Sequence, residues 1–156
     1  MAAGGLRTGT PCVDMLAGVD DDAFLRQFET LTLPFDQWTH RAHVRVGYLY
    51  VVGHGFEHAL VLVRRGIQAY NRHNQVPEGP DRGYHETLTH ALLHLIDVTV
   101  KEHGPAASSN AFFDDHPELH KKQVLRLFYS RGRMMSAEAK ATFVEPDLAP
   151  LPRSVR

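Results

Sequence analysis

The 156-residue chain contains a single cysteine and therefore has no pair with which to form an internal disulfide. Such sparse cysteine is typical of proteins in a reducing compartment, so we expect a cytoplasmic location. The sequence also lacks an apolar run long enough to cross a membrane, and residues 1–18 lack the basic start and sustained apolar core of a signal peptide. These absences argue against a disulfide-stabilised scaffold and against membrane association.

A strong charge of either sign is absent as well. The chain has 17 Lys and Arg against 18 Asp and Glu, a formal net charge of −1, and its basic residues are scattered. Nucleic-acid-binding domains usually carry a basic stripe, so nucleic acid is not expected as a partner. At this length the chain can bury a core without help from a structural metal. What stands out instead is histidine: eleven are spread through the sequence.

Apolar residues recur every three to four positions, which predicts an all-α, single-domain bundle of about five to six helices. The expected layout is a flexible lead-in over residues 1–20, the bundle over 21–145, and an extended proline-rich tail over 146–156. Asp36 is the expected N-cap of the second helix, and the stretch between residues 103 and 117 is expected to be a loop. The expected helices span 21–31, 37–52, 56–73, 84–103, 117–129 and 136–143.

Helix geometry identifies two inward-facing histidines on the second expected helix. At about 100° per residue, His40 and His43 lie about 60° apart, on the face that carries Val44 and Gly47. Gly47 leaves space beside the two rings because it has no side chain. An H-x-x-H pair on one helical face can present two imidazoles to a single metal ion.

A third histidine is expected to face inward from the fourth helix. His85 aligns with Thr89, Leu92 and Ile96 along the apolar face, and Glu86 lies about 100° away at its edge. The other histidines are expected on the surface, where adjacent pairs could hold an ion only weakly. These eight are His54, His58, His73, His90, His94, His103, His116 and His120.

Short loops make consecutive helices antiparallel neighbours, so alternate helix ends meet at one end of the bundle. His40 and His43 start the second helix, Tyr70 and Asn71 end the third, and His85 with Glu86 starts the fourth. Inward polar side chains lower stability unless they are paired. Their convergence therefore predicts a functional site at this end.

Imidazoles together with one carboxylate suit Zn²⁺, Fe²⁺, Mn²⁺, Ni²⁺ or Cu²⁺. Glu86 is expected to be the fourth ligand or a general base acting on metal-bound water. Packing is the alternative role for Tyr84, and a salt bridge is the alternative role for Arg45. The predicted roles are metal ligation by His40, His43, His85 and Glu86, catalysis by Glu86 and Tyr84, and substrate binding by Tyr70, Asn71 and Arg45.

Three functional hypotheses follow from this pattern. The first is a metal-dependent enzyme that acts on a small molecule, because one small bundle offers a pocket rather than a long cleft. The second is a non-catalytic module that binds a metal or a small ligand. The third is an interaction protein whose inward histidines are hydrogen-bonded core residues without a ligand.

Several segments also resemble a family of short, mostly bacterial proteins of unassigned function. The marks of the resemblance are H-x-x-H-V within residues 35–50, G-I-Q-A-Y-N at 66–71, G-Y-H-E-T at 83–87 and V-E-P-D-L-A-P-L-P at 144–152. The resemblance covers nearly the whole chain after the first twenty residues and implies no particular chemistry. It supports a single domain, draws attention to His40, His43, Tyr84, His85 and Glu86, and implies that the tail around 145–147 packs near the site.

Overall fold

The computed structural model describes the backbone of residues 10–154 and the side chains from residue 20 to residue 154. This part of the chain is an all-α single domain without strands, as the periodicity predicts. None of its helices is long and apolar enough to cross a membrane. In chain order the elements are α1 (Thr10–Glu29), η1 (Phe35–Gln37), α2 (His40–His54), α3 (Phe56–His73), α4 (Glu86–His103), α5 (Ser109–Asp115), η2 (Pro117–Leu119), η3 (Lys122–Leu127), α6 (Arg131–Met134) and α7 (Ala137–Ala141), where η denotes a 3₁₀ helix.

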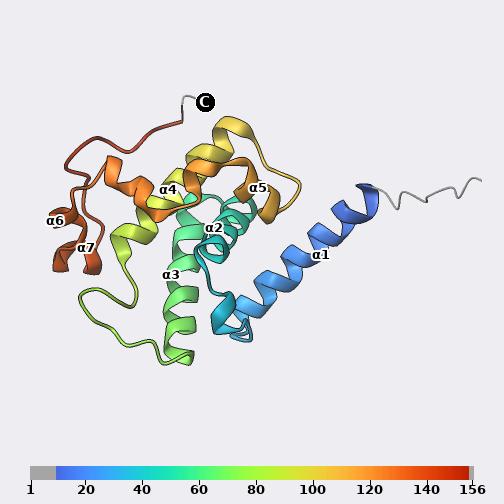
Figure 1. Cartoon of the computed structure of the whole chain (residues 1–156), viewed down its shortest axis with the longest axis horizontal. Coiled ribbons are helices and arrows are strands. Elements are labelled where there is room, and N and C mark those ends of the chain that lie inside the picture. Colours follow the sequence, from blue (N-terminus) through green and yellow to red (C-terminus); the bar gives the residue numbers. More distant parts are fainter. Residues whose placement is uncertain (1–9, 155–156) are drawn as a thin grey trace, which may run out of the picture.

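The first helix begins earlier than expected. α1 starts at Thr10, so residues 10–20 of the expected lead-in are helical, while residues 1–9 lie outside the described part. The helix projects away from the body of the domain (Figure 1). Its C-terminal part is anchored by Phe24 and Phe28, which are buried. Phe28 packs so closely on α3 that a Cβ at Gly66 would come within 2.6 Å of its ring.

Helices α2, α3 and α4 form the centre of the domain (Figure 1). A single residue, Gly55 at φ +80°, turns the chain from α2 into α3. The cap of α2 is Thr39, whose hydroxyl accepts the Ala42 N–H at 3.3 Å. The expected cap, Asp36, is wrong because that residue belongs to the separate turn of η1.

Helix α4 begins directly after the loop of residues 74–85, at the same end of the bundle as the start of α2. His85 is its N-cap, so the helix starts at Glu86 rather than at residue 84. Gly83, which precedes the cap, has φ +86°, and a Cβ there would collide with the Glu78 carboxylate. Glycine is therefore required at this entry to α4.

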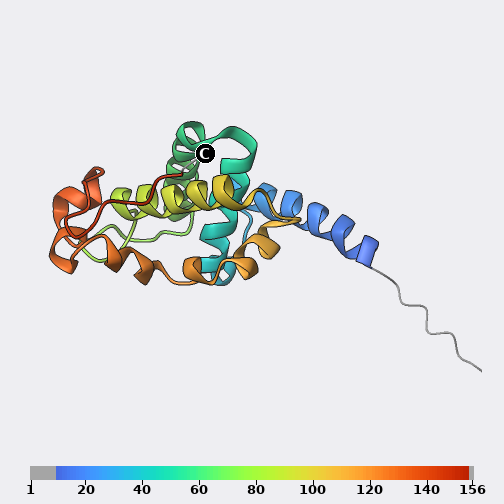
Figure 2. The same cartoon turned by 90° about the horizontal axis from the view of Figure 1, so that it is seen from above.

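The chain after α4 differs most from expectation. The expected loop contains α5, which Ser108 caps and which buries Phe112 and Phe113. The expected helix over 117–129 is instead two 3₁₀ helices, η2 and η3. This segment runs back along α4 (Figure 2). Ser136 caps α7 by accepting the Ala139 N–H.

Residues 143–154 have no helix, which agrees with the expected extended tail, while residues 155–156 are outside the described part. Two carbonyls hold the tail to the bundle. The hydroxyl of buried Tyr129 donates to the Val144 carbonyl at 2.8 Å, and the ring of His94 donates to the Pro152 carbonyl at 2.6 Å.

Candidate functional site

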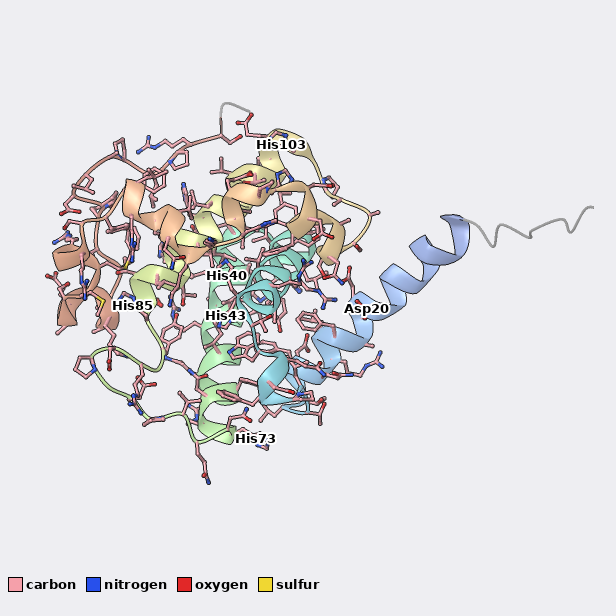
Figure 3. The ribbon with its side chains drawn as sticks, viewed as in Figure 1. Asp20, His40, His43, His73, His85 and His103 are labelled. Atoms are coloured by element: carbon pink, nitrogen blue, oxygen red, sulfur yellow. The ribbon has the colours of Figure 1, made fainter. Side chains whose placement is uncertain are left out.

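A cavity of about 480 Å³ lies where α2 and α4 begin and α3 ends. Its walls are aromatic and aliphatic, its polar lining is dominated by histidine, and its rim carries two lysines. Figure 3 shows His40 and His43 near the middle of the domain and His85 to their left, whereas His73 and His103 lie at its edges. The lining residues are Phe35, Trp38, His40, His43, Ile67, Asn71, Val76, Gly83, Tyr84, His85, Leu88, Thr89, Leu92, His120, Lys121, Lys122 and Gln123.

The rings of His40 and His43 are held by backbone carbonyls. Nε2 of His40 donates to the Leu119 carbonyl at 2.8 Å, and Nδ1 of His43 donates to the Thr39 carbonyl at 2.7 Å. A carbonyl oxygen can only accept, so these two nitrogens carry the protons. In the neutral rings, Nδ1 of His40 and Nε2 of His43 are therefore left with lone pairs.

His85 uses both of its ring nitrogens for the fold. Nε2 donates to the Met134 carbonyl at 2.8 Å, and Nδ1 accepts the Leu88 N–H at 3.1 Å as the cap of α4. His85 is therefore a structural residue at the cavity wall, and it can bind a ligand through nitrogen only by giving up one of these bonds. His120 resembles His40, because its Nε2 donates to the Phe113 carbonyl at 2.6 Å.

Two of the cavity histidines, His43 and His85, are shifted towards the uncharged form. Burial lowers the pKa of His43 to about 4, against the opposing hydrogen bond to Thr39, and the charges of His40 and Lys122 lower it further. Burial also lowers the pKa of His85, with the charges of Lys140 and Lys122 acting in the same direction. His43 is accordingly neutral at physiological pH and presents an acceptor nitrogen rather than a cation.

Trp38 forms one wall of the cavity and is the only tryptophan in the chain. Its indole packs on the His43 ring, with centroids 3.9 Å apart. Behind it lie Phe28 at 5.0 Å and Tyr70 at 5.1 Å, so the ring continues into the core. The fluorescence of the protein therefore reports on the site through a single indole.

Glu86 is directed away from the histidines into an ion pair. It is buried, and its carboxylate accepts hydrogen bonds from Arg64 Nε at 2.8 Å, from Arg64 Nη2 and from the Tyr84 hydroxyl. Burial opposes ionisation of Glu86, but the hydrogen bonds from Arg64 and Tyr84 outweigh it and lower the pKa of Glu86. Burial and the carboxylate together raise the pKa of Tyr84, so its hydroxyl stays protonated as a donor.

The three predicted substrate-binding residues occupy different places. Asn71 lines the cavity, as predicted. Tyr70 is fully buried, and its hydroxyl donates to the Leu33 carbonyl at 2.8 Å, so it packs behind the site rather than in it. Arg45 is absent from the lining and pairs with Asp20 at 2.7 Å and with Asp21 at 3.3 Å, the salt-bridge alternative.

The structure does not bring the four predicted metal ligands together. Glu86 is paired with Arg64, and both nitrogens of His85 have partners. Among the side chains of residues 20–154, no three His, Cys, Asp or Glu groups are arranged to hold a metal ion. Of the predicted set, His40 and His43 keep lone pairs for a ligand. Metal binding itself stays a prediction.

Sequence reasoning missed several residues of the cavity. His120 was expected on the exposed face of a helix, but the break between η2 and η3 turns its ring inward, where it stacks on Phe113 at 4.3 Å. Lys121 and Lys122 reach the cavity for the same reason. Trp38 had a usable signal, because it stands two residues before the H-x-x-H pair that begins α2.

Only some of the histidines that were expected on the surface are exposed. His54, His58, His73 and His103 are exposed, as predicted. Four others are half-buried: His90, His94, His116 and His120. His90, for example, is covered by Phe143 of a later segment, with ring centroids 3.9 Å apart.

The tail packs beside the site rather than in it. The Ser130 hydroxyl donates to the Asp147 carboxylate at 2.5 Å, and the Glu145 carbonyl accepts from Arg133 at 3.0 Å. These bonds secure α6, whose Met134 carbonyl holds the ring of His85. The tail therefore supports the cavity wall indirectly, through α6.

No family model matches the sequence, and no curated protein or solved structure matches it significantly. The resemblance to a bacterial family therefore stays a prediction.

Proposed function

We propose that the protein binds a small organic molecule in the histidine cavity, and that its imidazoles recognise hydrogen-bond donors on that molecule. The observation that carries the proposal is the fixed protonation pattern of the rings. His40, His43 and His120 each donate one N–H to a backbone carbonyl, so each neutral ring keeps a lone pair on its other nitrogen. Preformed polar groups in a largely apolar cavity are the usual composition of a ligand site.

The low pKa of His43 favours recognition over proton abstraction. A general base works best when its pKa lies near the operating pH, and burial brings the pKa of His43 to about 4. A neutral ring of such weak basicity accepts a hydrogen bond from a ligand but removes only an acidic proton. Binding is therefore the better-supported role of this residue.

A fragment screen monitored by Trp38 emission tests the proposal. His43→Asn is the informative variant, because an asparagine amide can still donate to the Thr39 carbonyl while the Nε2 acceptor is lost. We expect fragments that shift the emission of the wild type to bind at least about tenfold more weakly to His43→Asn, because one buried hydrogen bond is lost. His58→Asn, an exposed change on α3, is the control and should bind like the wild type.

Equal binding of all hits by the wild type and by His43→Asn would refute the proposal. A screen without any hit that shifts the emission or the melting temperature would do the same. A hit that both histidine variants weaken equally would indicate a general loss of stability rather than a contact in the cavity.

A metal-dependent enzyme is the second candidate, and one specific observation favours it. Metal-ligating histidines usually donate their second ring nitrogen to a carbonyl, the arrangement of His40 and His43. The remaining ligands would come from the bound molecule or from water. Metal analysis of protein purified without a tag tests this candidate: a metal retained by the wild type and lost in His40→Ala supports it, whereas equal metal content contradicts it.

A further inference from the structure

A small, mostly apolar slot adjoins the histidine cavity on the side of the core. It has a volume of about 40 Å³, room for a group of roughly one to three carbons. Five side chains line both the slot and the cavity, so the two adjoin: His43, Ile67, Leu88, Thr89 and Leu92. The residues found only in the slot are Gly47, Val63, Leu93 and Ile96.

Gly47 keeps this slot open. A Cβ at this position would lie 2.9 Å from Cδ1 of Ile96 and 3.1 Å from Cδ1 of Leu93. Both of these atoms are the far ends of flexible side chains, so a methyl group at Gly47 would displace them rather than the backbone. The glycine also stands about one turn after His43 on α2, and both residues line the slot.

The rim of the cavity is positive. Lys121 and Lys122 stand at its rim, and none of its described lining residues is acidic. Two helices also begin at this cavity: His40 is the first residue of α2, and His85 caps α4. The N-terminus of each helix carries a partial positive charge and favours an anion.

We propose that the ligand of this cavity is a small organic anion with a short apolar chain. Its anionic group lies at the lysine rim, its polar middle meets the imidazoles, and its chain enters the slot beside Gly47. This inference rests on the proposed small-molecule function and adds the chemical class of the ligand. The positive rim selects the anion, and the volume left by Gly47 selects the chain length.

Straight-chain carboxylates from acetate to octanoate, titrated against Trp38 emission and by calorimetry, test the inference. Affinity should rise about fourfold for each added methylene until the slot is filled, and then level off. Alcohols of the same chain lengths should bind more weakly. Matched alkyl phosphates show whether the rim prefers a carboxylate or a phosphate.

Two variants separate the chain from the charge. Gly47→Ala should remove the gain from the last one or two methylenes while acetate binds as before, and Leu92→Ala should allow a longer chain. Gly53→Ala, on the same helix with nothing within 4 Å of its added Cβ, is the matched control. Lys122→Gln should weaken the binding of carboxylates about tenfold, because it removes one partly screened charge, and should leave the binding of alcohols unchanged.

The outcomes distinguish the two proposals. Binding that depends on His43 but not on chain length, on Gly47 or on the charge at Lys122 would overturn the anion and slot assignment and leave small-molecule binding intact. Equal binding of donor-bearing fragments by the wild type and by His43→Asn, together with carboxylate affinities that ignore chain length and Lys122, would overturn both. Wild-type-like chain-length profiles in both Gly47→Ala and Leu92→Ala would show that the slot is not used.

Discussion

The stability of the protein should depend on pH through His43. Its pKa falls from 6.5 in the unfolded chain to about 4 in the folded protein, because folding buries the ring. Between these two values the unfolded chain binds more protons than the folded protein does. The contribution of the neutral ring is therefore fully present above pH 6.5 and is lost as the pH falls towards 4.

The size of the effect follows from the two pKa values. For a single group with these constants, the free energy of unfolding drops by about 2 kcal/mol between pH 7 and pH 5, and by about 3 kcal/mol by pH 4. Other histidines and carboxylates titrate in the same range, so the measurement needs a reference. His43→Asn supplies it, because it keeps a donor to the Thr39 carbonyl and removes the titrating ring.

Urea unfolding followed by far-ultraviolet circular dichroism at pH 7, 6, 5 and 4 gives both stability curves. The wild type should lose about 2 to 3 kcal/mol relative to His43→Asn across this range, with most of the loss below pH 6. In the native protein, Trp38 emission should change with a midpoint near pH 4, because a cation would form against its ring. Parallel pH profiles of the two proteins would refute the argument that burial holds this ring neutral.

Three further predictions concern the surroundings of the cavity and use the same unfolding assay. Glu86→Gln leaves the Arg64 guanidinium without its buried partner and should cost about 1 to 3 kcal/mol at pH 7; an unchanged midpoint would contradict the pairing. Gly83→Ala forces a side chain into a left-handed backbone and should destabilise by at least about 1 kcal/mol, whereas Gly53→Ala in an exposed helical turn should be neutral or stabilising. Arg45→Met should lower stability by about 1 to 3 kcal/mol and leave ligand binding unchanged, and altered binding would show that it belongs to the site.

The histidines illustrate how far helical phase alone can go. Phase and antiparallel packing placed His40, His43 and His85 at one end of the bundle, and all three line the cavity. The same reasoning could not assign their ring nitrogens, because the carbonyl partners of His40 and His85 lie 79 and 49 residues away. It also put Glu86 beside the histidines, whereas Arg64 on the neighbouring helix turns the carboxylate away.

The chain after α4 shows where sequence reasoning failed. The apolar residues within 117–129 have the spacing of a helix. The segment nevertheless forms two short 3₁₀ helices, which run alongside α4. The break between these turns brings His120, Lys121 and Lys122 to the cavity. No local pattern distinguishes such a segment from a regular helix, because the choice depends on the surface against which it packs.

The sequence by itself determined the all-α class, the three central helices and the end of the bundle at which histidine gathers. Apolar period, glycine turns and caps are local properties, and they act within a few residues of one another. Only the tertiary structure decided which histidine keeps a lone pair, where Glu86 finds its partner, and that Gly47 opens a slot beneath the cavity. These outcomes depend on carbonyls, a guanidinium and side-chain ends supplied by distant segments, so they exist only once the helices have packed.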